Sequence, residues 1–420
     1  MDLFDDLVRR GLAHQWTGED ALAARLRSGP ITLYDGFDPT APSLQVGNLV
    51  GIMLLRRFQA AGHRPVVLMG GATGMIGDPS GKSEERNLQT PEQVQANLET
   101  QRAQFERFVD FGRGALLVNN ADWFGDFGFI DFMRDVGKHV PVNVMLAKES
   151  VRARLESPAG ISFTEFSYML MQAYDFLHLA REHDCELQIG GSDQFGNIVA
   201  GIDLARRVDG RQLYGLTHEL ITDSSGQKLG KTAAGAIWLD AGRTSPYAFY
   251  QYWLRVQDAD AGRFLRVLTE LDHDEIDALE ARAVEAPAKR EAQQRLAEWL
   301  TRLVHGEEGL AAARRATDAL FGGELKGLGE AELLEIFADV ASASLPRTRL
   351  GALNVVDALI EAGLAKSKGD ARRLIEAGGA TVNNRRIASV DETLSSEDLA
   401  SETVMVLRAG KKSYALLRFT

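Results

Sequence analysis

The chain has 420 residues, of which 45% are hydrophobic and 25% charged. At ~150 residues per domain this length predicts about three domains, and the composition is that of a folded globular protein. A peptide hormone, an isolated binding module and a disordered tail are therefore excluded.

The charge is unevenly distributed along the chain. The formal net charge is −12, yet residues 345–420 carry 12 Lys and Arg against 9 Asp and Glu, whereas the other residues carry 35 against 50. The basic C-terminal part is either an ordinary solvated surface or an RNA-contacting module attached to an acidic enzyme.

The sequence indicates a cytoplasmic protein. The single cysteine, Cys185, cannot close an intramolecular disulfide or build a zinc cluster, which suits a reducing compartment. The first twenty residues are acidic and amphipathic, and nowhere do about eighteen uncharged apolar residues follow one another. We therefore expect a protein that is neither exported nor inserted in a membrane. The 8 histidines are scattered without a close helical pair, so we expect no metal ligand among them.

The first half of the chain alternates between predicted strands and helices. Short apolar runs that read as buried parallel strands occupy residues 31–36, 65–71, 115–120 and 185–191. Helical patterns lie between them at residues 49–61, 91–108 and 163–179. This order predicts an α/β fold with a Rossmann-type, doubly wound parallel sheet over residues 1–245. Ligands bind beyond the carboxyl ends of such strands, where this chain is rich in Gly, Asp, Asn and Gln.

The first polar segment, residues 34–48, runs from a strand end into a helix. Gln45 and Asn48 are three residues apart on the first helical turn, beside free backbone N–H groups. Gly47 allows a flat group to approach the backbone. A nucleotide phosphate fits this position, although a capped helix start with a polar face is an equal alternative.

Two glycine-bearing loops, at residues 70–86 and 226–232, carry cations. Neither matches a P-loop, because Gly77 and Gly81 enclose three residues where that motif requires four. Lys82 and Arg86 on one loop, and Lys228 and Lys231 on the other, suit a triphosphate whose leaving group gains charge. The alternative is that these are solvated loop charges.

Two further segments carry polar groups toward the same edge. Tyr168, Gln172 and Asp175 recur at helical spacing and form one face, which is either the solvent side or the wall of a polar pocket. After the strand at 185–191, Asp193 and Gln194 are acceptors suited to ribose hydroxyls.

The second half of the chain changes character. Amphipathic helices follow one another to about residue 320, so we expect a helical domain at 246–330, a linker at 331–348 and a small α+β domain at 349–420. In the last domain, helices at 355–362 and 368–376 precede a turn at Asn383-Asn384 and two strands that flank Gly410-Lys-Lys.

Taken in this order, the segments resemble bacterial tyrosyl-tRNA synthetases, a class I aminoacyl-tRNA synthetase family. Residues 70–83, 160–168, 187–194 and 302–308 carry the likeness, which covers essentially the whole chain. It implies a tyrosine-tRNA ligase that activates L-tyrosine with ATP to tyrosyl-adenylate and pyrophosphate, and then transfers tyrosine to the 3′-terminal ribose of tRNA(Tyr). It also implies a homodimer, Mg²⁺ carried on ATP without a protein-bound metal site, an anticodon-side helical domain and a C-terminal RNA-binding domain like that of a small-subunit ribosomal protein.

The resemblance also implies roles for individual residues. Tyr34 and Asp175 would bind the substrate phenol, and Asp78, Tyr168 and Gln172 its α-ammonium. The residues implied around adenosine and the reacting carboxylate are Gly36, Asp38, Gly47, Asn48, Gly191, Asp193 and Gln194. Those implied at the phosphates are Thr40, Gln45, Lys82, Arg86, Lys228, Lys231 and Thr232.

The chain departs from the family pattern at a few positions. Gln45 stands at the first histidine of the family motif His-x-Gly-His and cannot become cationic, so we expect slower activation. Leu229 replaces Phe, Phe195 replaces Trp, Asp35 stands where Cys is common and Ala121 where Tyr is common.

These departures leave two alternatives to the ligase. Gln45 supports a paralogue that has lost activation and acts as an RNA-binding or regulatory protein. A nucleotidyltransferase for another small acid shares the sheet, but does not account for Tyr34 paired with Asp175 or for the RNA-type tail.

Overall fold

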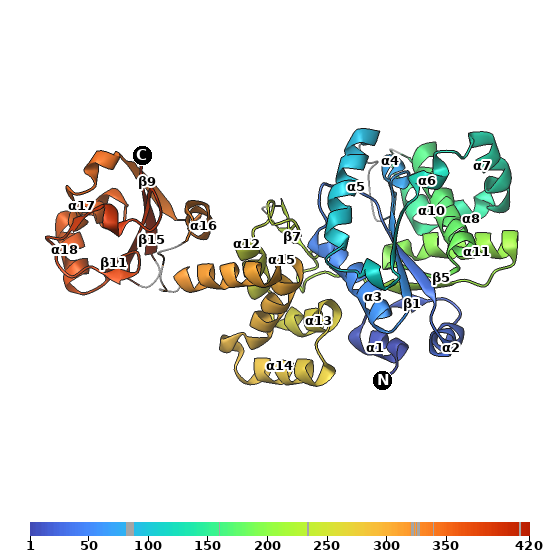
Figure 1. Cartoon of the computed structure of the whole chain (residues 1–420), viewed down its shortest axis with the longest axis horizontal. Helices are drawn as coiled ribbons and strands as arrows, with labels where there is room; N and C mark the ends of the chain where they lie inside the picture. The colour runs from blue at the N-terminus through green and yellow to red at the C-terminus, as the bar shows by residue number, and fades with distance from the viewer. Residues whose placement is uncertain are drawn as a thin grey trace. The chain divides into compact units, whose positions relative to one another are not determined.

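The computed structural model describes residues 1–80, 88–158, 160–232, 235–320, 323, 325, 328–338, 340–410 and 413–420 (Figure 1). Two compact units contain these residues. One comprises residues 1–245 with 249–305, and the other comprises residues 246–248 with 306–420.

The first unit is built on a six-stranded sheet of order β1-β6-β5-β2-β3-β4. Its strands are β1 (Gln15–Trp16), β2 (Thr32–Phe37), β3 (Arg64–Met69), β4 (Leu116–Asn119), β5 (Cys185–Gly191) and β6 (Tyr214–His218). β2 to β6 are parallel, and β1 lies antiparallel to β6 at the edge. The predicted α/β sheet is confirmed, and β2 to β5 are the four predicted strands. β1 and β6 were not predicted.

Helices cover both faces of this sheet, with α5 on one side and α10 and α11 on the other (Figure 1). The helices are α1 (Leu3–Arg10), α2 (Asp20–Ser28), α3 (Leu49–Ala60), α4 (Thr73–Ile76), α5 (Pro91–Phe105), α6 (Ala121–Phe124), α7 (Phe129–Asp135), α8 (Val142–Leu146), α9 (Glu149–Leu155), α10 (Phe163–Glu182) and α11 (Phe195–Asp209). Short 3-10 turns lie at η1 (Val46–Asn48), η2 (Phe111–Arg113), η3 (Gly137–His139) and η4 (Ser192–Gln194). Two-sided burial explains why β2 and β3 are almost continuously apolar.

The strand order determines where a ligand can bind. β2 pairs with β3 on one side and with β5 on the other, so the chain reverses direction across the sheet at β2. In an open parallel sheet the crevice lies at such a reversal, outside the carboxyl ends of the strands. On the α10 side, Tyr34, Val66 and Leu68 pack with Ala173 and Phe176, which brings α10 against β2.

The helices that follow the sheet in sequence belong to the same unit as far as residue 305, apart from residues 246–248. They are α12 (Pro246–Leu254), α13 (Asp258–Leu268), α14 (His273–Glu285) and α15 (Glu291–Leu320), with η5 (Pro287–Lys289) between the last two. Gly306 has φ 73° and ψ −178°, which interrupts α15. The boundary between the units thus falls inside the segment expected as one helical domain, residues 246–330.

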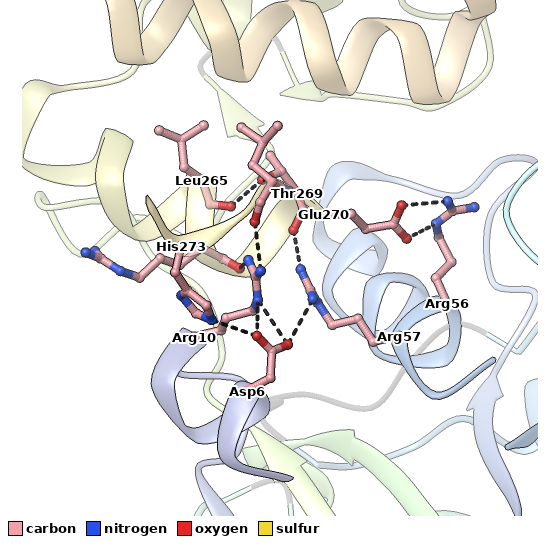
Figure 2. Close-up of polar contacts among 10 residues, drawn as sticks. Asp6, Arg10, Arg56, Arg57, Leu265, Thr269, Glu270 and His273 are labelled. Carbon is pink, nitrogen blue, oxygen red and sulfur yellow. Dashed lines mark hydrogen bonds and ion pairs between the residues drawn. The ribbon is translucent and has the colours of Figure 1, made fainter. Parts of the chain in front are cut away.

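An ionic cluster joins α13 and α14 to α1 and α3 (Figure 2). Asp6 accepts hydrogen bonds from Arg10 at 2.9 Å and Arg57 at 3.1 Å, and His273 Nε2 lies 2.7 Å from the same carboxylate. Arg10 also donates to the Leu271 carbonyl at 2.7 Å. These charged contacts, far apart in sequence, explain why residues 249–305 group with the sheet.

The second unit contains α16 (Glu330–Ile336), α17 (Val355–Glu361) and α18 (Lys368–Glu376), with turns η6 (Arg347–Arg349) and η7 (Ser396–Asp398). Its five-stranded sheet has the order β12-β11-β14-β15-β9. The strands are β9 (Ala341–Leu345), β10 (Leu353–Asn354), β11 (Ala380–Val382), β12 (Arg385–Arg386), β13 (Thr393–Leu394), β14 (Val404–Ala409) and β15 (Ser413–Phe419).

The expected linker at 331–348 is instead occupied by α16 and β9. β9 pairs in parallel with β15, from Ala341 opposite Ala415 to Leu345 opposite Phe419. Its run of alanines and serines resembles a linker in sequence, but an edge strand needs only its main chain to extend a sheet. Because the side chains of β9 are small, its sequence shows no apolar pattern from which a strand could be predicted.

The predicted hairpin of the second unit is confirmed. Asn383 and Asn384 have φ of 45° and 64°, as a two-residue type I′ turn requires, and they connect β11 with β12. In β14, Met405 and Leu407 pack with α17 and α18, whereas Val404 and Val406 pack with α16. Both faces of this sheet are covered, as the period of two predicts.

Candidate active site

A cavity of about 390 Å³ lies where β2, β3 and β5 end. The predicted site residues that line it are Tyr34, Gly36, Asp38, Thr40, Gln45, Gly47, Asn48, Asp78, Tyr168, Gln172, Asp175, Gly191, Asp193, Gln194 and Lys228. Lys231 does not line it; residues Lys231–Thr232 form β7, which pairs with β8 (Gly235–Ala236). Lys82 and Arg86 lie outside the described residues.

One end of the cavity combines a buried hydroxyl with a buried carboxyl group. Tyr34 is 0% exposed, and within the described chain its hydroxyl has no hydrogen-bond partner. Asp175 accepts hydrogen bonds from Asn120 at 3.1 Å and Trp123 at 2.9 Å. Burial raises the pKa of Asp175 well above its usual range, although these two donors oppose the shift. This end therefore offers hydrogen-bonding groups to a polar atom at the tip of an apolar ligand.

The two donors that hold Asp175 were not predicted as site residues. Asn120 directly follows β4, so the rule that ligand-binding groups follow strand ends could have identified it. Trp123 lies one helical turn further on, in α6, and carries no sequence signal that separates it from a core residue.

Asp38 connects the two walls of the cavity. It accepts hydrogen bonds from Tyr168 at 2.8 Å and Thr73 at 2.7 Å. A Cβ atom on Gly70 would lie 2.0 Å from an Asp38 oxygen, so a side chain at that position would displace the Asp38 carboxylate. Burial, and next the Asp38 carboxylate, raise the pKa of Tyr168, which keeps its hydroxyl a donor.

At the other end, Asp78 heads an amide network. Its carboxylate accepts from the Ser80 N–H at 2.9 Å and from Gln194 Nε2 at 2.6 Å. Gln172 Nε2 donates to Gln194 Oε1 at 3.2 Å, and Asn197 Nδ2 donates to Gln172 Oε1 at 3.0 Å. The carboxylate and amide oxygens suit a cationic group. Asn197 was not predicted as a site residue.

The helix start at Gln45 to Asn48 packs against the segment that contains Gly230 and Ile237. The Gln45 N–H donates to Asn48 Oδ1 at 2.9 Å, and the Val46 N–H donates to the Ile237 carbonyl at 3.0 Å. Gly230, with φ 77°, lies so close that a Cβ there would be 3.0 Å from Val46 Cβ. Lys228 and Gln45 consequently line the same cavity.

Asp35 adds a carboxyl group that the family resemblance does not account for. It is 7% exposed and lines the cavity. Burial raises the pKa of Asp35 to about 8. The hydrogen bond from the Gly36 N–H opposes this shift, and the Asp193 carboxylate adds to it. Gly51 makes room for this carboxyl group, because a Cβ there would lie 2.3 Å from Asp35 Oδ2. The protonated form is thus well populated at neutral pH.

The described part of the chain contains neither a candidate metal-ligand group nor a candidate membrane-spanning helix. Among the described residues, no group of three or more His, Cys, Asp and Glu side chains could hold a metal ion. None of the helices in the described ranges is both long and apolar enough to cross a membrane.

Comparison with known families covers nearly the whole chain. Residues 26–322 match the family of tRNA synthetases class I (W and Y), and residues 332–417 match the tyrosine–tRNA ligase SYY-like C-terminal domain.

Individual relatives agree with these families. The chain is 56% identical over 420 residues to the tyrosine–tRNA ligase of Rhodopirellula baltica, across 99% of this chain and 96% of that protein. It is 50% identical over 421 residues to the tyrosine–tRNA ligase of Roseiflexus castenholzii, across 99% of both. A C-terminally truncated mitochondrial tyrosyl-tRNA synthetase of Aspergillus nidulans superposes with a TM-score of 0.69 and 30% identity, covering 76% of this chain and 94% of that structure.

Proposed function

Since the chain belongs to the tyrosine–tRNA ligases of the class I synthetase family, we propose that its cavity is the site where L-tyrosine is activated with ATP and then transferred to tRNA. The relatives give no support to the alternative of an activation-impaired paralogue with only an RNA-binding or regulatory role.

The observation that carries the proposal is the polarity of the two cavity ends. Tyrosine has a phenol at one end and an α-ammonium at the other. The Tyr34 hydroxyl and Asp175 match the phenol, and Asp78 with Gln172 and Tyr168 matches the α-ammonium. Phenylalanine would leave the Tyr34 hydroxyl unpaired, a discrimination for which this enzyme family is the standard example.

Activation needs alignment and charge stabilisation rather than a general base. The tyrosine carboxylate is already ionised at pH 7, and its oxygen forms the new bond to the α-phosphorus as the bond to pyrophosphate breaks. Lys228 and Lys231 stabilise the departing charge, together with Thr40, Gln45, Asn48, Lys82, Arg86 and Thr232. Mg²⁺ enters with ATP, on its phosphates. The adenosine and carboxylate side is formed by Gly36, Asp38, Gly47, Gly191, Asp193 and Gln194.

In the second step a ribose hydroxyl of the tRNA attacks the tyrosyl carbonyl and AMP leaves. The basic stretch at residues 345–420 is the part of the chain that supports tRNA binding, because phosphate contacts dominate RNA affinity. We infer a cytoplasmic enzyme, since that compartment holds its tRNA.

A homodimer is part of the proposal. Large apolar side chains are exposed on α7, α8 and the start of α10, including Phe129, Ile130, Val142 and Phe163, which is 64% exposed. An apolar surface of this kind marks a protein interface. The variant Phe163→Asp is expected to sediment as a monomer where the native chain sediments as a dimer.

The test of the proposed activity is exchange of labelled pyrophosphate into ATP by the purified chain, followed by charging of tRNA(Tyr). We expect exchange with tyrosine and none with phenylalanine. Absence of tyrosine-dependent exchange from a folded chain would refute the assignment of activation to this cavity.

A further inference from the structure

A continuous chain of hydrogen bonds runs from Lys148 to the amino-acid end of the cavity. Lys148 Nζ donates to Asn197 Oδ1 at 3.2 Å. Asn197 Nδ2 in turn lies 3.0 Å from Gln172 Oε1 and 3.3 Å from Gln194 Oε1. Gln194 Nε2 completes the chain at 2.6 Å from Asp78 Oδ2.

The charge of Lys148 gives this chain a direction. An ammonium has donors and no acceptor, so the Asn197 side chain must turn its oxygen toward Lys148 and its amide nitrogen toward the cavity. That nitrogen orients both glutamine oxygens. Gln172 Oε1 keeps a second lone pair for a donor-only ligand such as an α-ammonium, whereas Gln194 Oε1 already accepts from both Asn197 and Gln172 Nε2.

The position of Lys148 is not explained by helix stability. It is the residue before α9, with no capping hydrogen bond from its side chain, and a cation at a helix N-terminus is opposed by the helix dipole. Instead α9 is anchored to α10 by Arg154 and Glu165, which form two 2.8 Å hydrogen bonds and are each 3% exposed.

The surroundings leave room for the lysine stem at the cavity wall. Lys148 passes beside Gly196, where an added Cβ would lie 3.7 Å from its Cδ and Cε, at ordinary contact distance. Burial lowers the pKa of Lys148 to about 7, while the facing charged group, Asp78, acts in the opposite direction. Asn197 on α11 is neutral, and Arg154 and Glu165 on α9 and α10 are paired with each other.

We propose that Lys148 is a positioning residue of the amino-acid pocket, whose ammonium sets through Asn197 the direction in which the Gln172 side chain presents its acceptor oxygen to the substrate α-ammonium. The proposal rests on the proposed function, because it assigns the α-ammonium to this end of the cavity. Tyrosine affinity should therefore depend on pH. Below about pH 7 Lys148 is charged and orients the amides. Above about pH 7 the neutral amine has a lone pair, so Asn197 is free to turn.

The experiment compares Lys148→Met, Lys148→Arg and Asn197→Asp with the native chain in tyrosine-dependent pyrophosphate exchange between pH 6 and 8.5. Lys148→Met should raise the KM for tyrosine about tenfold, the effect of about 1.4 kcal/mol, while kcat and the KM for ATP change less than threefold. The rise of the native KM with pH around 7 should be absent in this variant. Lys148→Arg keeps a charged donor and should retain most of the affinity.

Asn197→Asp tests the same chain at a second residue, since it keeps the acceptor for Lys148 and removes the amide donor to the glutamines. It should raise the KM for tyrosine similarly. Lys138→Met, at an exposed lysine of η3, is the matched control and should change nothing.

Two results would overturn the inference. One is an unchanged KM for tyrosine in both Lys148→Met and Asn197→Asp; the other is a defect confined to the KM for tRNA. Failure of the native chain to exchange with tyrosine would instead refute the proposed function, so the two failures are distinguishable.

Discussion

At the scale of single residues, Gln45 is the departure with the most direct chemical consequence. Its side chain lines the cavity, and its N–H is held by Asn48, so the helix start keeps its geometry. A glutamine amide donates one neutral hydrogen bond, whereas a histidine can donate a charged one. The loss therefore falls on charge stabilisation and leaves the position of the loop intact.

We predict that Gln45→His raises the kcat of tyrosine-dependent pyrophosphate exchange. A charged hydrogen bond to the departing phosphate lowers the barrier by about 1–2 kcal/mol, which corresponds to a gain of about five- to thirtyfold. The KM for tyrosine should not change, because this end of the cavity does not hold the amino acid. Gln45→Ala should lose activity, and equal rates in all three chains would contradict the role.

We predict that Tyr34→Phe increases the stability of the free protein and weakens its discrimination between tyrosine and phenylalanine. The Tyr34 hydroxyl is buried without a partner in the described chain, so Tyr34→Phe removes an unsatisfied group and should stabilise the free protein by about 1 kcal/mol. The same change removes the hydrogen bond to the substrate phenol, so discrimination between tyrosine and phenylalanine should fall about tenfold.

These two effects are measured by urea unfolding and by competitive pyrophosphate exchange. Phe176, whose ring packs 5.3 Å from Tyr34, offers the control Phe176→Leu, which should destabilise the fold without a selective effect on phenylalanine. A Tyr34→Phe chain that keeps full discrimination would show that Tyr34 does not contact the phenol.

At the scale of elements, the cluster around Asp6 decides how the helices after the sheet are attached (Figure 2). Arg10 is 5% exposed, and Arg57 donates to Asp6 and to the Thr269 carbonyl. Burial opposes ionisation of Asp6, but the hydrogen bonds from His273 and Arg10 outweigh it and lower the pKa of this carboxyl group. Folding is therefore stabilised by the ionised form.

We predict that Asp6→Asn destabilises the protein by about 2–4 kcal/mol at pH 7, because Arg10 and Arg57 lose the charge that compensates their burial. Since the pKa of Asp6 is lowered on folding, its contribution is complete above the ordinary carboxyl pKa of about 4 and is lost as the pH falls through the lower folded value.

The difference in urea midpoint between the native chain and Asp6→Asn should accordingly be constant from about pH 5 to 7 and shrink below about pH 4. Asp131→Asn is the matched control, because its partner Arg134 is 63% exposed and such pairs contribute little. A difference that grows toward acid pH would contradict the sign.

At the scale of the whole molecule, the charge differs between the part of the chain that holds the cavity and the C-terminal part that is proposed to bind tRNA. The acidic first unit holds the cavity, and the second unit carries exposed cations, among them Lys366 and Arg372 on and before α18. RNA affinity depends on phosphate neutralisation, whereas adenylate formation involves no RNA.

We predict that Lys366→Glu with Arg372→Glu raises the KM for tRNA about tenfold and leaves pyrophosphate exchange unchanged. The salt dependence of tRNA binding should become shallower by about one unit of log–log slope for each phosphate that the variant no longer neutralises. Arg113→Glu, at an exposed cation of the first unit, provides the control for overall charge. Parallel loss of exchange would indicate that the two units are not separable in this way.

Much of the site could be read from sequence because of one rule of sheet topology. Residues 34–48, 188–194 and the polar face of α10 all follow or flank strands, and parallel strands bring their carboxyl ends to one edge. The pattern could not distinguish the polar face of α10 from a solvent face, since periodicity records that a face is polar and not what covers it. Asn197 and Lys148 were not predicted as site residues for the same reason.

The sequence by itself determined the parallel sheet, the edge that carries the cavity and the hairpin at Asn383-Asn384, because strand patterning and turn conformation depend on neighbouring residues. Only the tertiary structure decided that Lys148 meets Asn197 across 49 positions, that His273 meets Asp6 across 267, and that β9 completes a sheet. Such contacts form between residues that the chain brings together only after its elements have packed, and no local pattern records them.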